Sequence, residues 1–152
     1  MTIGKKKLSE KNNPYFPGKV YSSYVLDSYA LLAFFNNEKG VEIVRELLLG
    51  AAKNKLLLYL LNINLGEILY IVERELNINS AQLALSRIKE MPVQILYADL
   101  EATLKAAHFK ANYPISYADA FAAALAVLKG SVLVTGDKDF SKLDHLIKIL
   151  WL

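Results

Sequence analysis

The sequence predicts an α/β fold, a three-layer α/β/α sandwich around a central parallel sheet of four to five strands. Apolar runs of strand length alternate along the chain with longer stretches of helical periodicity, and this alternation is typical of βαβ units in a parallel sheet. The run at residues 56–61 is apolar throughout, as expected of a strand that helices cover on both faces. Crossovers between parallel strands then place helices on the two faces of the sheet.

The composition restricts the classes of protein to which this chain can belong. Its 152 residues, of which 54% are hydrophobic and 22% charged, suit one globular domain and exclude a disordered chain. The absence of cysteine excludes disulfides, thiolate nucleophiles and sulfur-ligated zinc, and it fits a reducing, cytoplasmic compartment. We expect no membrane partner, because the chain opens on polar residues and no apolar run could span a bilayer. The formal net charge of +3 is compatible with a polyanionic partner.

Residues 1–20 are expected to form a flexible N-terminal extension, and residues 21–152 a single domain. The extension contains three consecutive lysines and the breaker pairs Asn13-Pro14 and Pro17-Gly18, but it has no periodic pattern. No internal repeat and no inter-domain linker follows it.

The first part of the domain predicts two strands and two helices. The apolar stretch from Tyr24 predicts a short strand that stops at the carboxylate of Asp27. A helix over residues 29–35 follows at once. Residues 40–53 predict an amphipathic helix, and the apolar run at residues 56–61 is the second strand. The apolar face of the amphipathic helix consists of Val41, Val44, Leu47 and Leu48.

The middle of the chain predicts three helices and one short strand. Helical stretches cover residues 64–76 and 80–90, and Pro92 breaks the chain before a strand at residues 93–96. A further helix is expected over residues 99–111. Its predicted core face consists of Leu100, Leu104, Ala107 and His108.

The last part of the chain predicts one alanine-rich helix and two strands. The helix covers residues 116–129 and ends at Gly130. A compact β-branched strand is expected at residues 131–135, and the closing apolar stretch at residues 146–151 is the last strand.

Four acidic residues lie at boundaries between strands and helices: Asp27, Glu67, Asp119 and Asp137. Asp27 ends the first strand, Glu67 opens the helix after the second, and Asp137 follows the fourth. Because these loops lie at the carboxyl edge of a parallel sheet, their carboxylates can share one pocket. The helix that contains Asp119 leads into the fourth strand and should run antiparallel to it, so its first turn faces the same edge.

Each of these acids also has a purely structural interpretation. Asp27 suits the N-cap of the helix that follows it, and Asp137 and Asp139 suit a loop after a strand. The other two acids match the spacing of a capping box, in which an acidic side chain lies three residues after a polar N-cap. The pairs with this spacing are Asn64 with Glu67 and Ser116 with Asp119. The joint placement of the acids at one edge is what favours a functional site.

Electrostatics predicts what such a site must bind. Two carboxylates about 5 Å apart repel each other by roughly 3 kcal/mol at an effective dielectric constant near 20. A cluster of them therefore binds protons or a cation. Oxygen ligands favour hard ions, so Mg²⁺ or Mn²⁺ is expected. Such a metal activates a bound water and stabilises a phosphoryl oxygen, which points to phosphodiester hydrolysis.

Four short motifs carry the acids in chain order. They are Val25-Leu26-Asp27-Ser28, Asn64-Leu65-Gly66-Glu67, Ser116-Tyr117-Ala118-Asp119-Ala120 and Leu133-Val134-Thr135-Gly136-Asp137-Lys138-Asp139-Phe140. Together they resemble the PIN domain, and more closely the VapC-type ribonuclease toxins of prokaryotic type II toxin–antitoxin pairs. The resemblance runs from about residue 21 to residue 152. It implies an α/β/α sandwich, Mg²⁺- or Mn²⁺-dependent cleavage of RNA, a homodimer and inhibition by a cognate antitoxin.

The resemblance also assigns roles to the acids. Asp27, Glu67, Asp119 and Asp137 would be the catalytic acids, and Asp27, Asp119 and Asp137 would ligate the metal. Asp139 matches a second acid that often follows two positions later. The N-terminal extension departs from the compact pattern of the family.

Five further residues are expected to support the site. The hydroxyls of Ser28 and Thr135 can orient water or a carboxylate. Asn64 can brace the glutamate three residues on or cap its helix. Lys138 can contact a phosphate or remain a surface lysine. The ring of Tyr117 can stack on a base or pack in the core.

Two other functions remain open. The first is a catalytically inactive PIN-like module that binds RNA or protein, which metal-dependent RNA cleavage would distinguish. The second is a receiver-type signalling domain that binds Mg²⁺, but the strand at residues 56–61 is followed by Asn62 and not by a phospho-accepting aspartate. The sequence contains no glycine-rich phosphate loop with lysine and no histidine pair or catalytic triad.

Overall fold

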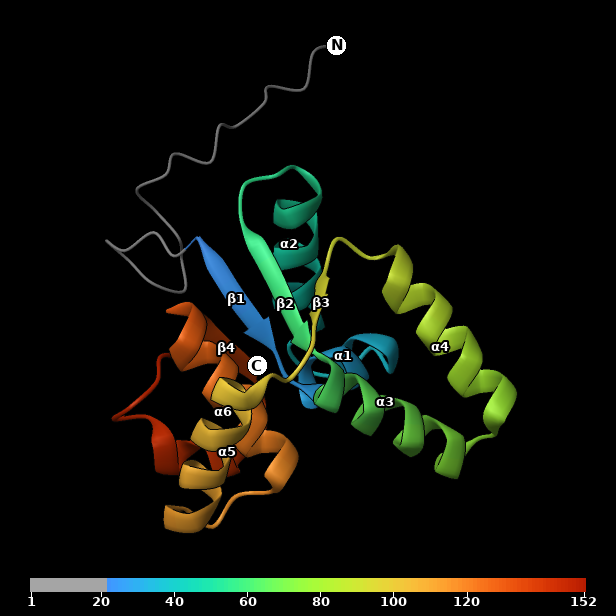
Figure 1. The fold of residues 1–152 in the computed structure, drawn as a ribbon. Helices are drawn as coiled ribbons and strands as arrows, with labels where there is room; N and C mark the ends of the chain where they lie inside the picture. The colour runs from blue at the N-terminus through green and yellow to red at the C-terminus, as the bar shows by residue number, and fades with distance from the viewer. Residues whose placement is uncertain (1–21) are drawn as a thin grey trace.

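The computed structural model describes residues 22–152, and the predicted extension over residues 1–20 lies outside them. Five parallel strands form one sheet in the order β3-β2-β1-β4-β5 (Figure 1). The strands are β1 (Ser23–Leu26), β2 (Leu57–Leu61), β3 (Gln94–Leu96), β4 (Val132–Thr135) and β5 (Ile149–Trp151). The predicted parallel α/β sheet is therefore confirmed, with five strands.

Six α-helices and one 3₁₀ helix, η1, connect the strands within the described residues. They are α1 (Ser28–Phe35), α2 (Val41–Ala52), α3 (Asn62–Glu75), α4 (Ile78–Glu90), α5 (Leu100–Asn112), α6 (Tyr117–Lys129) and η1 (Lys138–Leu143). None of the helices in residues 22–152 is long and apolar enough to cross a membrane.

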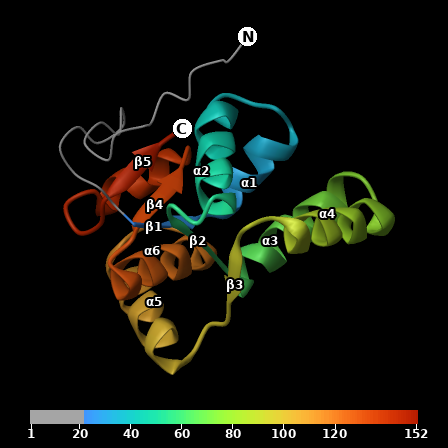
Figure 2. The same cartoon turned by 90° about the horizontal axis from the view of Figure 1, so that it is seen from above.

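The helices cover both faces of the sheet, because alternate strand residues point to opposite sides. In β1, Tyr24 and Leu26 belong to one buried cluster and Val25 to the other. The first cluster includes side chains of α1, α2, α3 and α4, whereas the second is formed mainly with α5, α6 and η1. Figure 2 shows these two helical layers on either side of the strands, with α3 and α4 forming a hairpin that extends away from the sheet. The predicted three-layer sandwich is confirmed.

The strand order excludes the receiver-type alternative. Receiver domains have the flavodoxin-like order 2-1-3-4-5, whereas β3 lies at the edge of this sheet and β1 lies between β2 and β4.

In the observed register Leu26 is paired with Val134. The residues that follow these two positions, Asp27 and Thr135, therefore emerge side by side.

Three predicted features differ from the structure. The helix expected from residue 64 begins at Asn62, with Leu61 as its N-cap. The loop expected after the fourth strand contains η1, because Asp137 caps a 3₁₀ turn there. The last strand is shorter than residues 146–151, since its first residue is Ile149.

The predicted core face of α5 is also wrong. Leu100 and Leu104 are 73% and 62% exposed, whereas Ala102, Ala106 and Phe109 are buried. α5 packs on the alanine-rich α6, and small residues allow the two helix axes to approach closely. The buried face of α5 is therefore the one that carries Ala102 and Ala106, with Phe109 at its C-terminal end.

Candidate active site

The carboxyl ends of the strands place all four predicted acids on one edge of the sheet. Asp27 follows β1, Asp137 follows β4, and Glu67 lies in α3, which follows β2. Asp119 lies in the first turn of α6. Because α6 leads into β4 and returns along the sheet, its N-terminus faces the same edge as the other three.

Asp27 is held at this edge by two hydrogen bonds. Its Oδ1 accepts from the backbone N–H of Ala30 at 2.8 Å, so Asp27 is the N-cap of α1. Its Oδ2 accepts from Thr135 Oγ1 at 2.5 Å. The side chain is only 2% exposed. The predicted N-cap role of Asp27 is thus correct, and the second oxygen of the same carboxylate faces β4.

Burial makes the charged form of Asp27 costly. Desolvation raises its pKa from the ordinary 3.8 to about 8, although the hydrogen bonds from Thr135 and Ala30 act in the opposite direction. The neighbouring carboxylates of Asp119 and Asp137 raise the pKa further. In the metal-free protein, Asp27 therefore retains its proton at neutral pH.

The buried hydroxyl of Thr135 connects two of the acids. It donates to Asp27 Oδ2 and accepts from the backbone N–H of Asp137 at 2.9 Å. The Asp137 side chain in turn accepts from the N–H of Asp139 at 2.9 Å and caps η1. Residue 135 thereby fixes both the carboxylate after β1 and the backbone that carries the carboxylate after β4.

Asp119 forms the predicted capping box with Ser116. The Ser116 Oγ accepts from the N–H of Asp119 at 3.1 Å, and the Ser116 N–H donates to Asp119 Oδ2 at 3.4 Å. Burial raises the pKa of Asp119, as do the carboxylates of Asp137 and Asp139, while the bonds with Ser116 lower it.

Glu67 lies one turn further along its helix than predicted, because α3 starts at Asn62. Burial raises its pKa first, and the carboxylates of Asp119 and Asp137 raise it further, while the hydroxyl of Ser28 lowers it by hydrogen bonding. The buried Ser28 Oγ also lies 3.2 Å from the carbonyl oxygen of Asn64.

Asn64 does not cap α3, because the N-cap of this helix is Leu61, so the predicted capping role is wrong. It is buried inside the first turn of α3, where its Nδ2 donates to the carbonyl oxygen of Ala118 at 3.1 Å and approaches Ser28 Oγ at 3.5 Å. Asn64 thus fastens α3 to α6 one residue before Asp119. Within the described residues its Oδ1 is buried without a hydrogen-bond partner.

The remaining predicted residues lie at the rim of this edge. Asp139 is exposed and pairs with Lys142 at 3.1 Å. Lys138 is exposed at the start of η1. Tyr117 is 47% exposed, and its ring makes an edge contact with Phe121 at a centroid distance of 4.8 Å. The sequence interpretation missed Lys142, although its i,i+3 spacing from Asp139 was a visible signal.

The acids share an electrostatic environment without forming a preassembled ligand set. Asp27 and Glu67 are each affected by Asp119 and Asp137, and Asp119 by Asp137 and Asp139. Within residues 22–152, however, no three His, Asp or Glu side chains lie close enough together to hold a metal ion. The structure therefore brings the acids to one edge but not to ligand distance.

The donor set nevertheless fits a hard divalent cation. The groups that converge are carboxylate, hydroxyl and amide oxygens, the ligands that Mg²⁺ and Mn²⁺ prefer. Burial and neighbouring carboxylates raise the pKa values of Asp27, Glu67 and Asp119. The buried, unpaired Oδ1 of Asn64 is a further acceptor in the same region.

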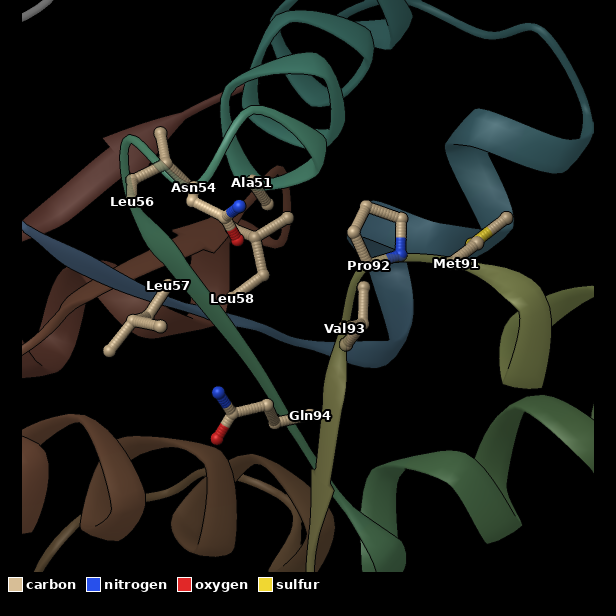
Figure 3. A pocket seen from close by; sticks show the side chains of 9 residues that line it. All are labelled: Ala51, Asn54, Leu56, Leu57, Leu58, Met91, Pro92, Val93 and Gln94. Atoms are coloured by element: carbon tan, nitrogen blue, oxygen red, sulfur yellow. The ribbon is translucent and has the colours of Figure 1, made fainter.

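A hollow of about 270 Å³ lies elsewhere in the molecule (Figure 3). It is formed where α2 ends and where β2 and β3 begin, with Asn54, Leu57 and Gln94 among its lining residues. This is the amino edge of the sheet, opposite the acids, and no acidic side chain lines the hollow. It is therefore not the predicted site.

The sequence from residue 24 to residue 146 matches the family model of the PIN domain. Among curated proteins, no sequence gives a significant match.

Several solved structures have a similar fold. VapBC2 from Rickettsia felis, bound to a promoter DNA fragment, has a TM-score of 0.67 at 20% identity and covers 83% of this chain and 96% of that chain. DNA-bound VapBC from Salmonella typhimurium has a TM-score of 0.66 at 19% identity, covering 84% and 96%. VapC20 from Mycobacterium tuberculosis, described as a sarcin–ricin loop cleaving toxin, has a TM-score of 0.63 at 19% identity, covering 78% and 92%. At these identities the likeness concerns the fold.

Proposed function

Because this chain belongs to the PIN domain family, we propose that it is a divalent-metal-dependent endoribonuclease and the toxin of a type II toxin–antitoxin pair. One observation carries the proposal: carboxylates from four separate segments lie at one edge of the sheet, and the pKa values of Asp27, Glu67 and Asp119 are raised by burial and, further, by neighbouring carboxylates. A cation relieves such repulsion.

Three of the acids would hold Mg²⁺ or Mn²⁺: Asp27, Asp119 and Asp137. When bound, the ion supplies a water of lowered pKa and a positive charge beside the phosphoryl oxygens of RNA. The oxygens of Asp27 and Asp119 already accept hydrogen bonds from backbone N–H groups or a hydroxyl. A carboxylate oxygen has two lone-pair sites, so these bonds orient the group and leave a site for the ion.

The other residues then act on the proton and the substrate. Glu67 is half-buried and has a raised pKa, which suits a base that removes a proton from the attacking water. Thr135 keeps Asp27 directed toward the edge. At the rim, the exposed Lys138 would contact a phosphate, and the exposed ring of Tyr117 would stack on a base.

The proposed partners are RNA as substrate, a cognate antitoxin and a second copy of the chain. Support for the antitoxin comes from similar folds crystallised as VapBC complexes, one of them with a promoter DNA fragment. A small protein encoded next to this chain should co-purify with it and suppress its activity. Light scattering after size-exclusion chromatography tests the homodimer, and a monomer at all concentrations contradicts it.

Asp27→Asn and Asp137→Asn are expected to lower Mn²⁺-dependent RNA cleavage by about 100-fold or more, because the metal contributes several kcal/mol to stabilising the transition state. The measurement is cleavage of a mixed RNA pool with Mn²⁺ and with EDTA. Circular dichroism checks that both variants remain folded.

Asp99→Asn is the matched control. Asp99 caps α5 by accepting from Ala102 N–H at 2.8 Å, but it contributes to none of the raised pKa values at the site. It should retain full cleavage. If the wild-type protein leaves every RNA intact with both Mg²⁺ and Mn²⁺, the alternative of an inactive PIN-like binding module takes the place of the enzyme.

A further inference from the structure

Two lysines bind adjacent carbonyl groups in the loop between α5 and α6. Lys110, in the last turn of α5, donates from Nζ to the carbonyl oxygen of Ile115 at 2.8 Å. Lys142, in η1, donates from Nζ to the carbonyl oxygen of Pro114 at 3.0 Å. Hydrogen bonds from a charged donor are stronger than neutral ones, so this loop is held from two sides.

The same loop leads directly to Asp119. Ser116, the next residue after Ile115, is the N-cap of α6 and forms the capping box with Asp119. Pro114 has no N–H group, and the N–H groups of Tyr113 and Ile115 bond to carbonyl oxygens within residues 109–113. The two ammonium groups bind the carbonyl oxygens of Pro114 and Ile115 and so add two bonds that connect the loop to α5 and η1.

Lys142 also connects this loop to the segment after β4. Its Nζ lies 3.1 Å from Asp139 Oδ1, and the N–H of Asp139 donates to the side chain of Asp137. One ammonium group thus joins the backbone that precedes Asp119 to the 3₁₀ turn that Asp137 caps. Among the described residues, Lys142 is thus the side chain whose hydrogen bonds join these two segments.

We infer that Lys142, assisted by Lys110, is a positioning residue that sets the separation between Asp119 and Asp137. The inference rests on the proposed function, since that separation matters when the two carboxylates share a metal. Lys142 does not itself reach the acids that would ligate the ion. It acts through the loop carbonyl and through Asp139.

The sign of the effect on metal affinity distinguishes positioning from simple charge. If Lys142 acted only as a nearby positive charge, its removal would strengthen the binding of a divalent cation. If it positions the carboxylates, its removal weakens binding. Loss of a group that hydrogen-bonds a metal ligand directly typically lowers metal affinity by about tenfold or more. Lys142 lies one step further from the ligands, so we expect a weakening of several-fold, below about tenfold, for Lys142→Met.

The experiment compares Lys142→Met, Lys142→Arg, Lys110→Met and Lys53→Met with the wild-type chain. Isothermal titration calorimetry measures Mn²⁺ affinity, and hydrogen exchange of the metal-free protein measures protection of residues 113–120. Lys53→Met is the matched control, because Lys53 is an exposed lysine at the C-cap of α2, at the opposite edge of the sheet. Arginine at position 142 keeps the charge and the donors, so it should restore most of the affinity.

Weaker Mn²⁺ binding and faster exchange in residues 113–120 for Lys142→Met, with neither change for Lys53→Met, support the inference. Unchanged or tighter Mn²⁺ binding by Lys142→Met overturns it. Lys110→Met tests the same loop independently if Lys142→Met does not fold. If the wild-type protein binds no Mn²⁺, the proposed function fails, and the exchange data alone then decide whether the lysines hold the loop.

Discussion

At the scale of single residues, the capping role and the site role of an acid coexist. Asp27 caps α1 through Oδ1 while Oδ2 faces Thr135. Asp119 bonds the N–H of its own N-cap residue and still raises the pKa of Asp27 and Glu67. A cap fixes the rotamer of a carboxylate, and a fixed carboxylate loses less conformational entropy when it binds a ligand.

Thr135→Val is expected to destabilise the protein by about 1–3 kcal/mol, because it leaves Asp27 Oδ2 and the Asp137 N–H without their buried partner. Valine keeps the shape of threonine, so the loss reports the hydroxyl. Urea denaturation monitored by circular dichroism measures the free energy of unfolding.

Thr103→Val serves as the control for this change. Its hydroxyl donates to the carbonyl oxygen of Asp99 within its own helix at an exposed position, so the expected effect is within about 0.5 kcal/mol. Equal effects at positions 103 and 135 would show that the hydroxyl of Thr135 has no special role.

At the scale of elements, the site depends on how α1 meets the turn after β4. Gly136 follows β4, and a Cβ atom built on it would lie 2.7 Å from Cζ of Tyr29 in α1. The absence of a side chain at position 136 lets the tyrosine ring cover the turn between Thr135 and Asp137. The contact couples the first turn of α1, which Asp27 caps, to the start of η1.

Gly136→Ala is expected to cost about 0.5–1.5 kcal/mol, because the added methyl group forces the Tyr29 ring, which is 38% exposed, away from its present rotamer. In a protein that already carries Tyr29→Ala, Gly136→Ala should cost much less, because the ring that it would strike is gone. A double-mutant cycle measures this difference. Additive effects would show that the two residues do not meet.

Gly66→Ala provides the opposite case in α3. No atom lies within 4 Å of a Cβ built there, and glycine disfavours a helix interior, so alanine should stabilise the protein by about 0.5–1 kcal/mol.

At the scale of the whole molecule, the fold gathers carboxyl groups at one edge of the sheet. The carboxyl edge of the sheet collects Asp27, Glu67, Asp119 and Asp137 from segments far apart in the chain, and burial raises the pKa of the first three. A folded-state pKa of an acid above its unfolded value means that the folded state binds the proton more tightly. The associated stability is fully present below the unfolded pKa and is lost as pH rises through the folded pKa.

The metal-free protein should therefore become less stable as the pH rises from the ordinary value of 3.8 toward about 8, the pKa of Asp27. Mn²⁺ should stabilise the protein more at pH 8 than at pH 5, because binding requires the ionised carboxylates. At 100 times the dissociation constant, the stabilisation is about 2.7 kcal/mol.

Thermal unfolding with EDTA and with Mn²⁺ across this pH range measures both effects. Subtracting the pH curve of Asp27→Asn from that of the wild-type protein removes the contributions of the groups that both proteins contain, including Glu67 and Asp119. Parallel pH curves for the two proteins would contradict the raised pKa of Asp27.

The predictions from sequence succeeded where the signal is local. The apolar run at residues 56–61, the alanine-rich stretch up to Gly130 and the pair Ser116 and Asp119 each indicate their element without reference to the rest of the chain, and the structure contains all three. Local signals failed for α5, since Leu100 and Leu104 repeat with helical spacing but face outward. Periodicity shows that a helix has faces, but not which face another element will cover.

Sequence alone determined the class of fold, the order of strands and α-helices and the placement of four acids toward the carboxyl edge of the sheet, because each follows from residue periodicity and chain direction. Only the tertiary structure decided the strand order, the start of α3 at Asn62, and the contacts of Asn64, Thr135 and Lys142 with residues distant in the chain. Those contacts depend on the pairing of β1 with β4 and on the packing of α3 against α6. Side chains far apart in sequence meet only after that packing forms, so no local pattern contains them.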